Sequence, residues 1–223
     1  RYFLGKGLSV IAPDFPGHGH STGPFLDTIS EMADWVTLCI NALGAESILL
    51  AGHSMGALVA LEVASREKKR VSRLALLGAG FPMTVSPLLL DAARNDSQAA
   101  RDMVVLFGHG YRAYRGGSAI AGMNIMEGAV RLLQRSNPGA LYTDLNACNE
   151  YSDGLEAAKN VTAVTRFISG EQDRMTPLST ASSILEQIDN ATLSVIPSSG
   201  HMMVNEAPEL THRYLVSALL SEI

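Results

Sequence analysis

The sequence is poor in the features that mark several classes of protein. Only two cysteines occur in 223 residues, so no disulfide framework is expected. The 17 Lys and Arg residues are outnumbered by 22 Asp and Glu residues, which gives a formal net charge of −5. No basic block is long enough to coat phosphates, so the sequence argues against nucleic acid as a partner. No apolar run approaches the roughly 18–20 residues of a membrane span. Because 47% of the residues are hydrophobic, these absences leave a globular domain with a substantial core.

Apolar, β-rich runs alternate with helical patterns along the chain. We expect strands at residues 8–12, 47–51, 74–78, 166–169 and 192–196. We expect helices at residues 28–43, 56–68, 177–188 and 208–220. The strands are near-continuous apolar runs, which are typical of a parallel sheet covered by helices on both faces. The sequence therefore predicts an α/β fold with a mostly parallel sheet.

The helix expected at residues 28–43 has clear start and stop signals. Thr28 and Glu31 have the spacing of a capping box, and Gly44 stands where a helix C-terminal cap belongs. Residues 81–164 break the strand–helix rhythm, because they are helical and glycine-dotted without a clear strand. We interpret that region as an insertion between the third and fourth strands.

Ser54 is the candidate nucleophile. It stands in Gly52-His-Ser-Met-Gly56, a G-x-S-x-G pattern that lies directly between an apolar strand and a helix. The two glycines allow a sharp turn without Cβ clashes, and the turn lifts the serine oxygen above the strand end. The backbone N–H of Met55 then faces the same space and is a candidate oxyanion donor.

His201 is the candidate base that a serine nucleophile needs. Among the six histidines it is the one that follows the last strand in a glycine-flanked loop. Asp173 follows the fourth strand and is the candidate acid that would orient the histidine. Glu171 is the alternative acid, but it stands closer to the strand, and we favour Asp173.

Four ordered segments of the chain resemble the α/β-hydrolase superfamily. Residues 12–21 look like the segment after its fourth strand, residues 52–56 like its nucleophile elbow, and residues 170–173 like its acid loop. Residues 200–208 look like its histidine loop, and the chain order serine, aspartate, histidine is that of the family's triad. The resemblance covers nearly the whole chain. It implies a core at residues 1–80 and 165–223, with residues 81–164 as the family's helical cap.

The resemblance also implies that strands are absent at the N-terminal side. Family members normally begin with two or three more strands, and the third ends in a loop that supplies the second oxyanion N–H. In the family's order this strand lies between the strands expected here at 8–12 and 47–51, so both would face a gap with unpaired edges. We therefore expect that the chain is a fragment or lacks an N-terminal part, or that a partner chain or a rearrangement fills the slot.

The sequence says less about the substrate. Met55, Met175, Met202 and Met203 flank the triad residues, and Met175 and Met202 are the candidate pocket residues for an apolar acyl group. Arg112 and Arg115 are candidates to hold a carboxylate, although we interpret them as solvated loop charges. No cluster has metal-ligand spacing and no phosphate loop is complete, so no cofactor and no metal are expected.

The combined hypothesis is a serine hydrolase that cleaves an ester, thioester or related carbonyl substrate through an acyl-enzyme. The family also contains C–C bond hydrolases, enol-lactonases, perhydrolases and acyltransferases with the same triad, and these alternatives stay open. A non-catalytic receptor or scaffold for a small molecule is the alternative outside enzymes. A small-molecule substrate is the expected partner, and a cytoplasmic location follows from composition and family habit.

Overall fold

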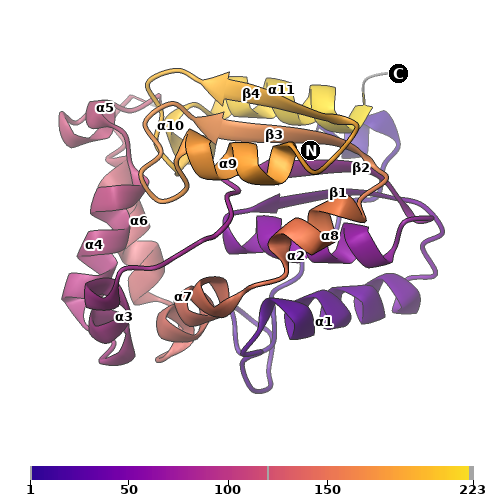
Figure 1. The fold of residues 1–223 in the computed structure, drawn as a ribbon. Coiled ribbons are helices and arrows are strands. Elements are labelled where there is room, and N and C mark those ends of the chain that lie inside the picture. The colour runs from indigo at the N-terminus through magenta and orange to yellow at the C-terminus, as the bar shows by residue number, and fades with distance from the viewer. Residues whose placement is uncertain (1, 120, 221–223) are drawn as a thin grey trace.

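The computed structural model describes residues 2–119 and 121–220 (Figure 1). The described strands are β1 (Ile48–His53), β2 (Val71–Leu77), β3 (Val164–Gly170) and β4 (Ala191–Ile196). The longer helices are α1 (Ile29–Ala42), α2 (Met55–Arg66), α3 (Pro87–Arg94), α4 (Gln98–Gly108), α6 (Ile125–Gln134), α7 (Ala140–Glu150), α9 (Leu178–Leu185) and α11 (Pro208–Leu220). Shorter helices are the 3-10 turn η1 (Leu4–Lys6), α5 (Tyr111–Tyr114), α8 (Gly154–Lys159) and α10 (Met203–Glu206).

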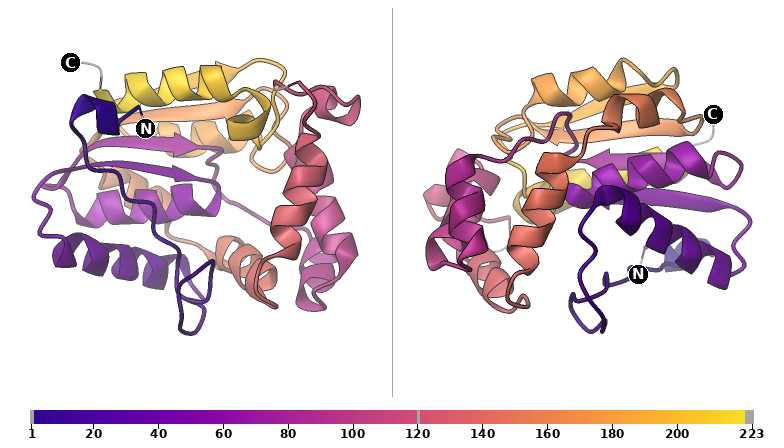
Figure 2. Two further views of the ribbon diagram at one scale, coloured as in Figure 1. Left: turned by 180° about the vertical axis from the view of Figure 1, so that it is seen from behind. Right: turned by 60° about the horizontal axis from the view of Figure 1, so that its bottom comes forward.

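The sheet is parallel throughout the described part of the chain, with the strand order β1-β2-β3-β4. Alternate residues of a strand point to opposite faces of the sheet. The continuous apolar runs of β2 and β3 therefore supply apolar side chains to both faces. Leu74 and Leu76 pack on the side of α1 and α2, whereas Ala75 and Leu77 pack on the side of α11. The expected α/β fold, with helices on both faces of a parallel sheet, is confirmed (Figure 2).

The strand expected at residues 8–12 is absent, and that prediction is wrong. The segment has no strand assignment, and Val10 and Ile11 are 54% and 58% exposed. An isolated strand gains no ladder hydrogen bonds, and no described strand lies beside this segment to supply them. The expected buried slot between two unpaired strands therefore does not form. Instead, β1 is an edge strand, five of whose six residues are half-buried.

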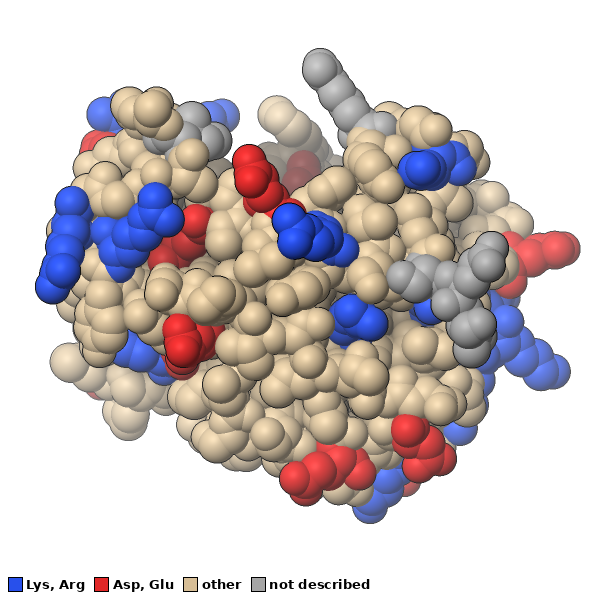
Figure 3. All heavy atoms as spheres, turned by 90° about the horizontal axis from the view of Figure 1, so that it is seen from above, with Lys and Arg blue, Asp and Glu red and all other residues tan. Residues whose placement is uncertain are grey.

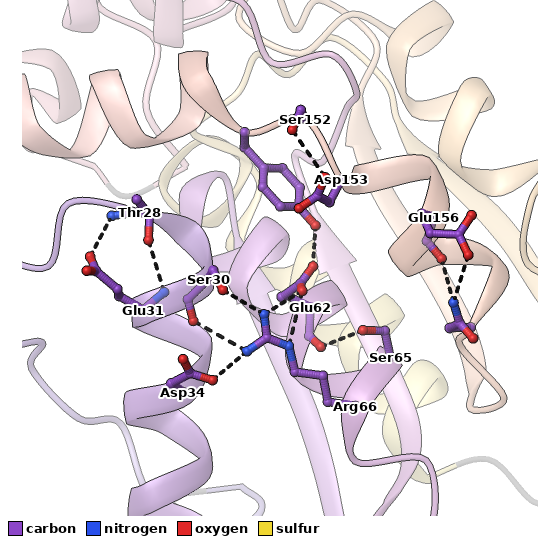
Figure 4. Close-up of polar contacts among 12 residues, drawn as sticks. Thr28, Ser30, Glu31, Asp34, Glu62, Ser65, Arg66, Ser152, Asp153 and Glu156 are labelled. Carbon is purple, nitrogen blue, oxygen red and sulfur yellow. Dashed lines mark hydrogen bonds and ion pairs between the residues drawn. The ribbon is translucent and has the colours of Figure 1, made fainter.

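The first helix begins as its sequence predicts. The Thr28 side chain accepts the Glu31 N–H at 3.1 Å, and the Glu31 carboxylate accepts the Thr28 N–H at 3.2 Å (Figure 4). This reciprocal capping box satisfies N–H groups that a helix start leaves without partners. The expected start of α1 is confirmed.

Helices α3 to α7 lie together beyond the carboxyl ends of the strands (Figure 1). They come from the insertion expected at residues 81–164, whereas α8, from the same region, packs against α2 and α9 beside the sheet. The division into a core at residues 1–80 and 165–223 and a cap at 81–164 stays a prediction. The arrangement places helical side chains directly over the strand ends where the candidate site residues lie.

A polar network ties the end of this insertion to the helices of the sheet layer (Figure 4). The Arg66 guanidinium donates to Glu62 at 2.6 Å, to Asp34 at 2.6 Å and to the Ser30 hydroxyl at 2.9 Å. The Tyr151 hydroxyl donates to the second oxygen of Glu62 at 2.5 Å. Because Glu62 is buried, these partners are what make its charge tolerable inside the fold. The network thereby fixes α1, α2 and the segment after α7 to one another.

None of the described helices is both long enough and apolar enough to cross a membrane. On the face drawn in Figure 3, basic and acidic side chains are interspersed among uncharged ones.

Candidate active site

Ser54 occupies a strained turn between β1 and α2. Its backbone has φ 56° and ψ −121°, a conformation that non-glycine residues rarely adopt. The turn is tight, because a Cβ on Gly52 would lie only 2.0 Å from the Gly56 carbonyl oxygen. The N–H of Ser54 donates to Leu77 O at 2.9 Å, which anchors the turn to β2. The predicted strand–turn–helix around Ser54 is therefore present in the fold.

Met55 is the first residue of α2. The first N–H groups of a helix have no intrahelical acceptor, and the helix dipole places partial positive charge at that end. A negatively charged oxygen bound beside Ser54 would thus meet a favourable electrostatic environment.

The fold brings His201 and Asp173 together from separate loops. His201 follows β4 and Asp173 follows β3, and Nδ1 of His201 lies 2.8 Å from Oδ2 of Asp173. Both side chains are almost fully shielded from solvent. The Nε2 atom of His201 is also buried and forms no hydrogen bond with any described residue. With Nδ1–H donating to the carboxylate, Nε2 carries the free lone pair that a general base needs.

Asp173 is held as a carboxylate by a set of hydrogen bonds. Its Oδ1 accepts the N–H groups of Met175 at 2.9 Å and Thr176 at 2.8 Å, and its Oδ2 accepts the Thr176 hydroxyl at 2.8 Å. Burial raises the pKa of Asp173, but the hydrogen bond and charge of His201, followed by the bonds from Thr176, outweigh it and lower the pKa overall. The alternative acid Glu171 is exposed and accepts the Ser198 N–H at 2.7 Å.

Thr176 and His53 are neighbours of this pair that the sequence analysis did not single out. The Thr176 hydroxyl lies 3.1 Å from His201 Nδ1, in addition to its bond to Asp173. His53 Nε2–H donates to the His201 carbonyl oxygen at 2.8 Å, and the two rings lie 4.8 Å apart. Burial, followed by the charge of His201, lowers the pKa of His53 to about 4. The one available signal was position, since His53 precedes Ser54 and Thr176 follows Asp173 by three residues.

A cavity of about 270 Å³ opens at Ser54, between the strand ends and the overlying helices. Most of its lining is apolar, and its described lining residues are Ser54, Met83, Thr84, Val85, Ser86, Leu89, Val104, Phe107, Leu145, Cys148, Arg174, Met175 and Thr176. Met175, a predicted pocket residue, lines the cavity. Met202, the other one, is absent from this lining and packs against the apolar side chains of α3 and α4.

The loop between α4 and α5 is fastened to the loop that carries His201. One carboxylate, that of Glu206, accepts the Gly110 N–H at 2.8 Å and the Gly200 N–H at 2.9 Å. The Gln172 side-chain oxygen accepts the Tyr111 N–H at 2.8 Å. The backbones also touch, since a Cβ on Gly200 would lie 2.6 Å from Gly110 N. The insertion therefore contacts Gln172 and Gly200, the residues that immediately precede Asp173 and His201.

The two arginines considered from sequence lie away from this cavity. Arg112 lines a separate cavity of about 60 Å³ and donates to Ser118 O at 3.4 Å. Arg115 is exposed and is the C-cap residue that follows α5. Arg174, which the sequence analysis did not single out, lines the Ser54 cavity instead. No group of three or more His, Cys, Asp or Glu residues in the described part of the chain is arranged to hold a metal ion.

Known proteins resemble the chain in sequence along most of its length. The chain is 27% identical over 241 residues to a pimeloyl-[acyl-carrier protein] methyl ester esterase of Aromatoleum aromaticum, covering 99% of this chain and 89% of that protein. It is 31% identical over 227 residues to a 2-hydroxymuconate semialdehyde hydrolase of Pseudomonas putida, covering 96% and 77%.

Solved structures extend the likeness to the fold. An esterase from Exiguobacterium antarcticum superimposes with a TM-score of 0.81 at 22% identity, covering 93% of this chain and 80% of that one. The enol-lactonase from Burkholderia xenovorans LB400 gives 0.80 at 20% identity, covering 93% and 79%. The model of the alpha/beta hydrolase family matches residues 1–213. On its sequence and its fold together, the chain belongs to the alpha/beta hydrolase family.

Proposed function

We propose that this protein is a serine hydrolase that cleaves an ester, thioester or related carbonyl substrate with Ser54, His201 and Asp173. The observation that supports the proposal most strongly is the buried Nδ1–Oδ2 contact of 2.8 Å between His201 and Asp173. His53, the residue before Ser54, joins this pair to the turn through its hydrogen bond to the His201 carbonyl oxygen. Serine is a weak nucleophile at neutral pH, and an oriented imidazole is the group that activates it.

The reaction follows from the roles of these groups. The Ser54 hydroxyl attacks the substrate carbonyl carbon while His201 Nε2 takes its proton, and Asp173 stabilises the imidazolium through Nδ1–H. The Met55 N–H stabilises the oxyanion of the tetrahedral intermediate. His201 then protonates the leaving group, and an acyl-enzyme on Ser54 remains. Water activated by His201 releases the acyl group and restores the serine.

Ser54 Oγ is not hydrogen-bonded to His201 Nε2 in the described structure. Catalytic hydrogen bonds are often long before substrate binds and tighten in the complex. The Ser54 side chain is half-buried at the cavity, so a bound carbonyl group would reach it from that side.

The cavity supports an apolar acyl part as the main recognition element. Its buried lining residues are Met83, Leu89, Val104, Cys148 and Thr176. The relatives named above act on a methyl ester and on a semialdehyde by their names. C–C bond hydrolysis, enol-lactone opening, perhydrolysis and acyl transfer use the same groups and remain alternatives within this proposal.

The test is covalent labelling of Ser54 by a fluorophosphonate, measured by intact mass. The wild type should gain one adduct, and Ser54→Ala should gain none. Ser86 lines the same cavity, so Ser86→Ala is the matched control and should label like the wild type. An adduct that persists in Ser54→Ala would contradict Ser54 as the nucleophile. No adduct on any folded variant would contradict the proposal and favour a non-catalytic receptor.

A further inference from the structure

Arg174 gives the Ser54 cavity a single charged residue. The other described lining residues are apolar, hydroxyl or thiol side chains, so no carboxylate faces Arg174 from within this lining. Arg174 is exposed, as are Phe107 and Thr84 of the same lining, whereas Leu89 and Val104 are buried. The cavity therefore has an apolar inner end and a cationic mouth.

The guanidinium of Arg174 is held in place by the end of α4. Its Nη2 donates to the carbonyl oxygens of Leu106 and His109, the latter at 3.3 Å, and to the Tyr114 hydroxyl. Its central carbon lies 5.3 Å from the Phe107 ring centre and 5.5 Å from that of Tyr114. These contacts fix the side chain, so a ligand that used it would not have to order it.

The positive charge of Arg174 has no anionic partner in the described part of the chain. None of the ion pairs among the described residues involves Arg174. Of its five N–H donors, those on Nε and Nη1 have no hydrogen-bond acceptor among the described residues, since all of its hydrogen bonds to them come from Nη2. The carboxylate of the adjacent Asp173 is hydrogen-bonded to His201 and Thr176 instead. The arginine is thus fixed, charged and able to accept an anion.

We propose that Arg174 is a specificity-determining residue that selects carbonyl substrates bearing a carboxylate. The apolar part of such a substrate fills the inner end of the cavity, and its carboxylate meets Arg174 at the mouth. This inference rests on the proposed function, because it assigns the cleaved carbonyl to Ser54. A charge-assisted hydrogen bond to a carboxylate is stronger than one to a neutral group, which gives the selection its physical basis.

The kinetic test compares two nearly isosteric esters. One is a p-nitrophenyl ester of a dicarboxylic acid with a free carboxylate, and the other has a primary amide in place of that carboxylate. A series with two to eight methylenes varies the separation between the ester carbonyl and the carboxylate. At the best length, the wild type should prefer the carboxylate ester about tenfold or more in kcat/KM. Arg174→Gln should reduce the ratio to about one, and Arg174→Lys should retain part of it.

Arg112→Gln is the matched control, because Arg112 lies in the separate cavity and should leave the preference intact. If Arg174 only supported α4, Arg174→Gln would slow both esters equally and leave the ratio unchanged, which overturns the proposal. Equal turnover of both esters by the wild type at every length would also overturn it.

A binding measurement separates this inference from the proposed function. In the Ser54→Ala background, calorimetry gives Kd for each ester without turnover. If the carboxylate ester binds more tightly than the amide ester, and Arg174→Gln removes this difference, the role of Arg174 is supported. This holds even if the wild type hydrolyses neither ester. Equal Kd values for the two esters in the presence of Arg174 would refute the role of Arg174, whatever the wild type hydrolyses.

Discussion

Two neighbouring side chains, those of Asp173 and His53, have opposite effects on a positive charge on His201. Asp173 favours the imidazolium through the contact to Nδ1. The His53 ring lies 4.8 Å from the His201 ring, and its Nε2–H donates to the His201 carbonyl oxygen. A protonated His53 would repel a protonated His201, so the site works best when His53 is neutral. Its lowered pKa provides that condition across the neutral range.

The pKa of His53 predicts a pH-dependent loss of stability. In the unfolded chain this imidazole binds a proton below about 6.5, whereas in the fold it stays neutral down to about 4. The unfolded state therefore binds more protons in this window, and the free energy of unfolding falls as pH drops from 6.5 to 4. The expected loss from this group is at most roughly 3 kcal/mol.

Urea unfolding of wild type and His53→Gln at pH 7, 5.5 and 4 tests this. Glutamine keeps an N–H for the His201 carbonyl oxygen but does not titrate, so the variant should lose less stability on acidification. The exposed His20, changed to glutamine, is the control. Equal losses in the wild type and His53→Gln would show that His53 does not drive the effect.

At the scale of elements, the turn between β1 and α2 does most to place the candidate nucleophile. Only one of its two glycines is required by contacts within the turn. A Cβ on Gly52 would strike the Gly56 carbonyl, but a Cβ on Gly56 would meet nothing within 4 Å. The G-x-S-x-G pattern therefore contains one position fixed by backbone contact and one that is sterically open.

This difference predicts opposite results for two alanine variants. Gly52→Ala should force the turn apart, lower the free energy of unfolding by about 1–3 kcal/mol or more and abolish fluorophosphonate labelling. Gly56→Ala lies in the first turn of α2, where alanine is the better helix former, and should be neutral or stabilising by up to about 1 kcal/mol with labelling retained. Urea unfolding and intact mass give both readouts. Normal labelling of Gly52→Ala would contradict the turn as described.

At the scale of the whole molecule, the insertion and the sheet layer are joined by partly buried polar contacts. Glu206 joins Gly110 of the insertion to Gly200, the residue before His201. Tyr151, which follows α7, donates to Glu62 of α2. These two ties connect the helices above the strand ends to the sheet layer.

Removal of the Glu206 carboxylate should loosen the His201 loop. Glu206→Ala leaves two N–H groups without acceptors, and we expect fluorophosphonate labelling to slow about tenfold, with a free energy of unfolding lower by about 1–3 kcal/mol. Glu206→Gln keeps one acceptor oxygen and should fall between. The exposed Glu209→Ala, on α11, is the control. A labelling rate unchanged in a destabilised Glu206→Ala would limit Glu206 to a structural role.

Much of the fold could be predicted from local sequence. The capping box of Thr28 and Glu31 marks the start of α1, because its donors and acceptors lie three residues apart. The apolar runs mark β1 to β4, since a strand buried on both faces needs continuous apolar residues. Residues 8–12 carry the same signal but form no strand, because strand formation also needs a neighbour to pair with.

The sequence by itself determined the parallel α/β architecture, the family and the candidates Ser54, Asp173 and His201, since each follows from periodicity or from a motif at a strand end. The tertiary structure alone decided that Thr176 and His53 adjoin the pair, that Met175 lines the cavity while Met202 lies outside the lining, and that Arg174 rather than Arg112 meets Ser54's cavity. The physical reason is that hydrogen bonds, burial and cavity lining depend on distances between segments far apart in the chain, which no local pattern encodes.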